Sequence, residues 1–283
     1  MLTHVDRIQI ACPDRREAVA AFARLLGAEV VREDRVACLA AERTVLRLGT
    51  SEVEVLEPDG VGRVADWLGR CGSGLYGAGF ATPDPQALAA HWRALGRSLV
   101  TERDQLFLAA EASELPGLHA VVSRAEEREP IGLVRALYEV TLLVADHAEM
   151  ARRAARVFGL DAKRFHPIRS EPYGYAGTLT LFRDDALDRI EVVTPFDDTK
   201  TMGRFFRSHG PRLYMAYAEA DDPAAIRARL LEHAPRDWTG PREAKQPDNL
   251  YLHPKALGGV LLGVSRTSFG WIWSGHPERV VPA

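Results

Sequence analysis

The stretch Arg7-Ile8-Gln9-Ile10-Ala11-Cys12-Pro13-Asp14 contains the pattern that decides the fold. Apolar and polar residues alternate up to a turn at Pro13-Asp14, as in a half-buried strand. Residues Arg16–Leu26 then place apolar side chains at helical spacing, and Gly27 follows. Asp14 can accept hydrogen bonds from the free N–H groups of the first helical turn. The stretch therefore predicts a strand, a capped turn and an amphipathic helix.

The same pattern recurs three more times, which predicts a repeated unit. The further strands with their aspartates are Gly77–Asp84, Glu139–Asp146 and Met215–Asp222, and their helices are Pro85–Leu95, Ala148–Phe158 and Pro223–His233. Short strand candidates follow each helix. In the first unit they are Glu29–Glu33, Arg35–Leu39, Thr44–Leu48 and Glu52–Glu57, and in the third the clearest are Thr178–Arg183 and Arg189–Thr194. Each unit is predicted to be strand–helix–strand–strand–strand.

The links between units predict how they are grouped. Gly60–Gly74 and Phe196–Arg212 each contain a short apolar helix, whereas Arg124–Ala136 is charged and contains Pro130, as in an exposed linker. We therefore predict a first domain over 1–125, a linker over 126–136 and a second domain over 137–283. Each domain has the length to bury a core of its own.

Composition excludes several classes of protein. The 283 residues carry 36 Lys+Arg against 39 Asp+Glu, a net charge of -3, and 46% are hydrophobic, which is typical of globular proteins. Without a basic run we expect no nucleic-acid partner, and no apolar run approaches the ~20 residues that cross a bilayer. The three cysteines have unrelated spacings, and a strand begins almost at Met1, so we expect a cytoplasmic protein without a signal peptide, disulfides or a cysteine metal cluster.

Three further features resemble the vicinal oxygen chelate superfamily, which includes glyoxalase I, bleomycin-resistance proteins, methylmalonyl-CoA epimerase and the extradiol dioxygenases. Val5–Ala11 resembles its opening strand, Val53–Pro58 and Ile190–Pro195 resemble its Ile-Glu-Leu-x-x-Pro strand, and His253-Pro254-Lys255 with Gly258–Leu261 resembles an epimerase-like ending. The resemblance implies an α+β fold of four βαβββ modules paired into two cupped, incompletely closed mixed β-sheet domains. It also implies a divalent metal in a cup, held by histidines and glutamates, with positions open for two substrate oxygens.

This sequence departs from that family at the metal ligands. The positions of the family's histidines hold Arg7, Gly77, Glu139 and Met215, and only Glu54 and Glu191 remain of the glutamates. Because the permanent cation of Arg7 repels a divalent ion, we expect a salt bridge from Arg7 to Glu54 in place of the metal. No cofactor is expected. The alternative is an atypical divalent metal held by Glu139, Glu191 and a histidine such as His166.

Strand alternation predicts the side chains that line each cup. The first cup receives Arg7, Gln9, Glu54 and His119, unless His119 is only a half-buried, hydrogen-bonded histidine. The second cup receives Glu139, Thr141, Glu191, Tyr217 and Glu219. Two carboxylates in one apolar cup cannot both ionise cheaply, so one pKa rises and an acid lies beside a base. The alternative is that Glu139 or Glu191 forms a structural ion pair with Arg189 or Arg212.

Two segments outside the repeat have aromatic side chains. Phe165–Gly177, with His166, Tyr173 and Tyr175, is predicted as a loop that covers a ligand, the alternative being a packed surface loop. The tail Phe269–Trp273 is expected to cap a domain or to form a homodimer contact.

The leading functional hypothesis is an enzyme that acts on an oxygenated carbonyl or aromatic metabolite by metal-independent acid–base isomerase or lyase chemistry. Its acid/base pair is Glu139 and Glu191, and Tyr217 donates a hydrogen bond to a developing oxyanion. Substrate contacts are expected from Thr141, His166, Tyr173, Tyr175 and Glu219. The alternatives are a non-catalytic small-molecule or drug-binding protein of bleomycin-resistance type, and an atypical divalent-metal dioxygenase or glyoxalase-like enzyme.

Overall fold

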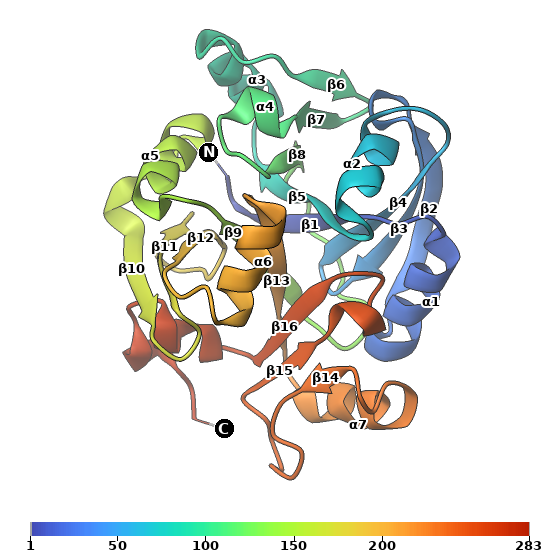
Figure 1. Cartoon of the computed structure of the whole chain (residues 1–283), viewed down its shortest axis with the longest axis vertical. Coiled ribbons are helices and arrows are strands. Elements are labelled where there is room, and N and C mark those ends of the chain that lie inside the picture. The colour runs from blue at the N-terminus through green and yellow to red at the C-terminus, as the bar shows by residue number, and fades with distance from the viewer. Residues whose placement is uncertain (1, 283) are drawn as a thin grey trace.

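A computed structural model describes residues 2–282 and contains two mixed eight-stranded sheets, each with helices packed against it (Figure 1). The strand order is β2-β3-β4-β1-β5-β8-β7-β6 in the first sheet and β10-β11-β12-β9-β13-β16-β15-β14 in the second. The two orders match element for element, so the second sheet repeats the first. The predicted α+β class with βαβββ modules paired into two cupped sheets is confirmed.

The first sheet is formed by the first two modules. Its elements are β1 (His4–Ala11), α1 (Arg15–Leu26), β2 (Glu29–Val36), β3 (Ala41–Leu48), β4 (Ser51–Pro58), α2 (Arg63–Cys71), β5 (Gly74–Thr82), α3 (Pro85–Ala94), β6 (Val100–Glu102), β7 (Gln105–Leu108), α4 (Ala110–Ser113) and β8 (His119–Arg124). In each module the first strand runs parallel to the last one, β1 with β4 and β5 with β8. The two modules join through the antiparallel pair β1 and β5.

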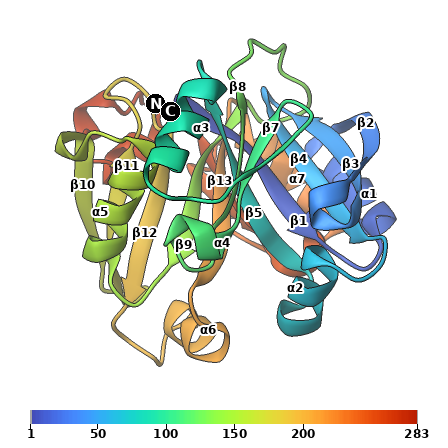
Figure 2. The same ribbon diagram turned by 90° about the horizontal axis from the view of Figure 1, so that it is seen from above.

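The second sheet is formed by the other two modules. Its elements are β9 (Ala136–Leu143), α5 (His147–Phe158), β10 (Phe165–Ser170), β11 (Tyr175–Leu181), β12 (Arg189–Pro195), α6 (Thr201–His209), β13 (Arg212–Ala220), α7 (Pro223–His233), β14 (Trp238–Thr239), β15 (Asn249–Leu252) and β16 (Leu261–Arg266), followed by a 3-10 helix at Phe269–Trp273. Seen from above, the link helices α2 and α6 lie on the same side of the molecule (Figure 2).

The four repeated aspartates cap the helices as predicted. Asp14, Asp84, Asp146 and Asp222 each accept a hydrogen bond from a backbone N–H in the first turn of α1, α3, α5 and α7 respectively. Each cap satisfies a donor that a helix start would otherwise leave free.

Helical faces of both halves bury one continuous apolar core. Phe80 of β5 lies 5.4 Å from Phe158 of α5 and 5.7 Å from Phe182, between ring centroids. The indole Nε1 of Trp92 in α3 donates to the carbonyl of Val157, at 2.9 Å, and α1 contacts α7. Each half also has a smaller apolar cluster of its own, and the amphipathic helices of one half pack on the other in the shared core. The division into domains 1–125 and 137–283 stays a proposal.

Two local predictions are wrong. Glu29–Glu33 and Arg35–Leu39 are not two strands: β2 runs unbroken over Glu29–Val36 beside β3, since no glycine or proline interrupts it, and Ala37–Leu39 is a 3-10 turn. Phe165–Gly177 is not wholly a loop, because Phe165–Ser170 pairs with β11 as β10. Among the described residues, no helix has the length and apolar character needed to cross a membrane.

Candidate functional site

The first cup is filled by a network of charged and amide side chains around Glu54. The wholly buried carboxylate of Glu54 accepts from Arg7 Nη1 at 2.6 Å, from Gln9 Nε2 at 2.8 Å and from Gln105 Nε2 at 2.9 Å. Arg43 Nη1 adds an ion pair at 3.1 Å. Burial alone would raise the pKa of Glu54, but the two guanidinium groups outweigh it and lower that pKa to about 2. Glu54 is therefore held as a carboxylate.

Arg7 is the centre of the same network. Its guanidinium also pairs with Glu52, at 2.8 Å, and donates from Nε to Asp6, at 2.8 Å, and only 3% of its side chain is exposed. The structure thus contains the predicted Arg7–Glu54 pair. Two buried cations around the one remaining glutamate do not fit a divalent metal, because they occupy the lone pairs that a metal would need and repel its charge.

His119 of β8 lies beside this network without joining it. Its ring is stacked on Tyr76, with centroids 4.6 Å apart, and its Nδ1 accepts from the Ala110 N–H at 3.3 Å. Burial lowers the pKa of His119 to about 4, so the imidazole is neutral at pH 7. This geometry is that of the alternative interpretation, a half-buried and hydrogen-bonded histidine.

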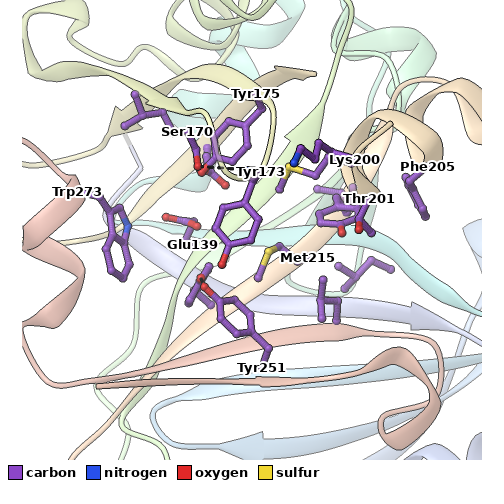
Figure 3. Close-up of a pocket in the computed structure, with 18 of the residues that line it drawn as sticks. Glu139, Ser170, Tyr173, Tyr175, Lys200, Thr201, Phe205, Met215, Tyr251 and Trp273 are labelled. Atoms are coloured by element: carbon purple, nitrogen blue, oxygen red, sulfur yellow. Dashed lines mark hydrogen bonds between the residues drawn. The ribbon is translucent and has the colours of Figure 1, made fainter. Parts of the chain in front are cut away.

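The second cup is hollow. A cavity of about 1320 Å³ contains Glu139, Glu191 and Tyr217 in its wall, together with the predicted His166, Tyr173 and Tyr175. Figure 3 shows Glu139 surrounded by side chains from the β10–β11 turn, from β13 and β15, and from the C-terminal tail, of which Trp273 is part. The cavity therefore brings together six of the side chains that the sequence singles out.

Two residues at equivalent registers distinguish the cups. Arg7 of β1 is opposite Glu52 of β4, whereas Glu139 of β9 is opposite Arg189 of β12, so the charges of the pair are exchanged. Arg189 Nε donates to Glu139 Oε2 at 2.6 Å, and both side chains are buried. The expected alternative, an ion pair between Glu139 and Arg189, is therefore present, but Glu139 also lines the cavity.

Glu191 is the register equivalent of Glu54 but has a different environment. Gln9 donates to Glu54, and at the same register Thr141 Oγ1 donates to Glu191 Oε2, at 2.5 Å. No guanidinium group contacts Glu191 within salt-bridge distance among the described residues. Burial, and then the nearby charge of Glu139, raise the pKa of Glu191 to about 8. A protonated carboxyl group thus lies beside an ion-paired carboxylate.

Two tyrosines complete the cup. The hydroxyl of Tyr217 in β13 donates to that of Tyr251 in β15, at 2.7 Å, which leaves the proton of Tyr251 free for a ligand. The ring of Tyr217 occupies the space beside Gly263 of β16. A Cβ at Gly263 would lie 2.2 Å from that ring, so only glycine leaves room for it. In this arrangement the hydroxyl proton of Tyr217 is engaged by Tyr251, and the role of Tyr217 as donor to a ligand stays a prediction.

The remaining predicted contacts lie apart from the cavity wall. Thr141 is wholly buried behind Glu191, which it orients. Glu219 lines a separate pocket of about 530 Å³, where its carboxylate accepts from the Ser268 N–H at 2.8 Å. Ala216, Ala218 and Ala220 all pack in the apolar core, so Glu219 stays on the same face of β13 as Tyr217, as strand parity predicts. It lies nearer the end of the strand, where Tyr138 and Trp271 line the separate pocket with it.

Sequence reasoning missed several wall residues. They are Lys200, Phe205, Arg212, Met215, Tyr251 and Trp273. Tyr251 could have been found from the strand register. An alignment of β15 on β16 pairs Tyr251 with Gly263, which is itself opposite Tyr217. Lys200 and Phe205 belong to the link between the third and fourth modules, and Arg212 begins β13, so their place around the cavity depends on the tertiary structure.

The second cup does not fit the family's metal either. Besides Glu139 and Glu191, the equivalent positions hold Met215 and Gly263, and Arg189 already occupies one carboxylate. Among residues 2–282 no group of three or more His, Cys, Asp or Glu side chains could hold a metal ion. The donor set is thus two carboxyl groups, one of which is already paired with Arg189, and no histidine at the equivalent positions, which is a poor match for the family's divalent ion.

Comparisons with known proteins agree with this fold. The family described as Glyoxalase/Bleomycin resistance protein/Dioxygenase superfamily matches residues 6–107. A mutant of 4-hydroxymandelate synthase from Streptomyces coelicolor has a TM-score of 0.68 at 14% identity and covers 99% of this chain and 100% of its own. A xylose isomerase-like TIM barrel/4-hydroxyphenylpyruvate dioxygenase fusion protein has a TM-score of 0.62 at 12% identity, over 94% of this chain and 49% of its own.

A third structure covers one half. Methylmalonyl-CoA epimerase from Mycobacterium tuberculosis has a TM-score of 0.39 at 21% identity, over 47% of this chain and 89% of its own. No curated protein matches the chain. The predicted resemblance to the superfamily is confirmed, and the matched residues 6–107 lie in the half whose cup is filled.

Proposed function

We propose, from the premise that this chain has the fold of the glyoxalase/bleomycin resistance/dioxygenase superfamily, that it is a metal-independent acid–base enzyme. Its second cup would move a proton on a small carbonyl compound, as an isomerase or lyase does. One observation carries the proposal. Glu54 and Glu191 occupy the same register of the repeat, yet two guanidinium groups pair with Glu54, while Glu191 lines an open cavity without such a partner among the described residues, and its pKa is raised.

The pair of carboxyl groups supplies both functions that proton transfer needs. Glu139, which pairs with Arg189, is the base that takes a proton from the carbon next to the carbonyl group. Protonated Glu191 and the free hydroxyl of Tyr251 donate to the carbonyl oxygen, where negative charge develops as the enol forms. Return of the proton to carbon completes an isomerisation and restores both carboxyl groups.

Supporting side chains fix this arrangement. Thr141 and Tyr217 act through Glu191 and Tyr251 respectively, so they are positioning residues. Tyr173, Tyr175 and His166 line the cavity wall above the floor and would contact the body of the substrate. Their aromatic faces would reduce the access of water, which strengthens the interactions of the two carboxyl groups.

Exchange of carbon-bound protons for deuterium tests the proposal. A panel of 2-oxo acids, acyl thioesters and cyclic ketones is incubated with the protein in D₂O and followed by proton NMR. We expect loss of the signal from the carbon next to the carbonyl for at least one compound, and a rate at least ~10²-fold lower with Glu191→Gln or Tyr251→Phe. The control variant Glu111→Gln changes an exposed carboxylate that does not line the cavity and should exchange at the parental rate.

A binding protein of bleomycin-resistance type is the second candidate. The volume of the cavity and its tyrosine and tryptophan side chains would suit an aromatic ligand. Compounds that bind, measured by calorimetry, but show no exchange would favour this candidate. Equal exchange rates in the parent, in Glu191→Gln and in Tyr251→Phe would contradict the acid–base proposal.

A further inference from the structure

The cavity has a second polar centre besides the two carboxyl groups. Arg212, the first residue of β13, lines the cavity and is only 8% exposed. Its guanidinium group is stacked on Trp67 of α2, 4.8 Å from the ring centroid, and faces Phe205 of α6 at 5.5 Å (Figure 3 shows Phe205). The two rings come from different halves of the chain, so the tertiary structure alone forms this site.

No acidic side chain neutralises Arg212. Among residues 2–282 its guanidinium forms no ion pair or hydrogen bond, and its buried Nε is without a partner. Burial lowers the pKa of Arg212, and within the described part of the chain the thiol of Cys71 is the one titratable neighbour that acts on it. The other buried arginines contrast with this: Arg7 and Arg43 in the first cup, and Arg189 in the second, each pair with a carboxylate.

The two aromatic contacts orient the guanidinium group of Arg212 in the cavity. Rings on the faces of a guanidinium group leave its N–H edges free, and these edges match the two oxygens of a carboxylate or phosphate. A buried cation without a counter-ion is costly, so an anion in the cavity would relieve that cost. Lys200, at the start of α6, lines the same wall and also forms no ion pair within the described part of the chain.

We propose that Arg212 is an anion-binding subsite and that the substrate carries a carboxylate or phosphate group remote from its reacting carbonyl. This inference rests on the proposed function for the role of the other end of the cavity. Tyr217, five residues further along β13, is opposite Glu139. Met215, three residues along β13, is opposite Thr141, which is in turn opposite Glu191. At ~3.3 Å per residue these two levels lie roughly 10 and 16 Å from Arg212 along the strand, and the ligand would span that length.

The direct test uses the parent protein and small anions. Phenylglyoxal modifies accessible arginine side chains, and peptide mapping reports the modification of each one. We expect inorganic phosphate or acetate, but not chloride at equal ionic strength, to protect Arg212 selectively, whereas exposed Arg207 on α6 is modified at an unchanged rate. Protection by phosphate alone would assign a phosphate-bearing ligand, and protection by acetate alone a carboxylate. No protection by either anion would overturn the subsite.

Variants test the same point by affinity. Arg212→Met keeps the apolar stem without the charge, and Arg212→Lys keeps the charge without the flat donor edge. We expect the dissociation constant for the protecting anion, measured by calorimetry, to rise at least tenfold in Arg212→Met and less in Arg212→Lys, and to stay unchanged in Arg207→Met. Unchanged affinity in a folded Arg212→Met protein would refute the subsite.

The two proposals fail separately. Suppose that Glu191→Gln binds the anion with parental affinity and that the parent exchanges protons on no compound. The anion subsite would then stand, and the acid–base function would be refuted. If Arg212→Met exchanges protons on an anionic compound at the parental rate, the acid–base function would stand and the anion subsite would be refuted. The first result would direct the search toward anionic ligands that are bound without reaction.

Discussion

Replacement of Glu191 by glutamine should stabilise the protein, although it removes a proposed catalytic group. Glutamine has the shape of the protonated acid and can still accept from Thr141. In the native parent the pKa of Glu191 is raised from 4.5 to about 8, so the native state keeps a proton that the unfolded chain releases above pH 4.5. The stability of the parent therefore falls as the pH rises from 4.5 to 8.

The magnitude follows from the two pKa values. Each pH unit well inside that window contributes about 1.4 kcal/mol, which amounts to about 3 kcal/mol at pH 7 and about 4 kcal/mol at pH 8, where Glu191 is half ionised in the native state. Glu191→Gln has no proton to release, so its free energy of unfolding should exceed that of the parent by up to these amounts. At pH 4.5 the two proteins should be nearly equal. The other groups that titrate are shared by both proteins, so the difference reports Glu191 together with its interaction with Glu139.

Glu54→Gln is the matched comparison, because it changes the same residue type at the same register of the other cup. The pKa of Glu54 is lowered from 4.5 to about 2, so its charge stabilises the native state above pH 4.5, and this stability is lost as the pH falls toward 2. At pH 7 the variant should lose at least about 3 kcal/mol, since it also removes a carboxylate from Arg7 and Arg43.

Urea unfolding followed by tryptophan fluorescence at pH 5, 6, 7 and 8 measures both effects. The reasoning predicts opposite signs for the two glutamates at pH 7 and a pH-dependent difference for Glu191 only above pH 4.5. It would be refuted by a Glu191→Gln protein that is less stable than the parent at pH 8, or by a difference that does not grow with pH.

Three further substitutions test the framework around the cups. Gly263→Ala should lower the free energy of unfolding by about 1–3 kcal/mol, since its Cβ would meet the Tyr217 ring; thermal unfolding equal to that of the parent would contradict the close approach. Arg7→Met should cost about 3–5 kcal/mol in urea unfolding, because it leaves Glu54 with a buried charge less well compensated, and a neutral effect would show that the network is not needed. Asp146→Ala should cost about 1 kcal/mol by loss of the α5 cap, and an unchanged melting temperature would argue against that cap.

The repeat and its helices were predictable from sequence because they depend on local signals. The aspartate caps, the apolar helical faces and the alternation along β1 and β9 need only neighbouring residues, and the structure bears them out. The pairing of Arg7 with Glu54 was also predictable, since the repeat places both at known registers in one cup. These features follow from the periods of strand and helix.

Other features depended on contacts between distant segments. The shared core of Phe80 and Phe158, the hydroxyl pair of Tyr217 and Tyr251, and the stacking of Arg212 on Trp67 all join elements that no short-range pattern relates. The contrast between Glu54 and Glu191 is of the same kind. Sequence alone determined that each strand carries a glutamate at one register. The tertiary structure decided which glutamate meets two guanidinium groups and which faces an open cavity, because the charge state of a buried carboxyl group depends on the partners that surround it in space.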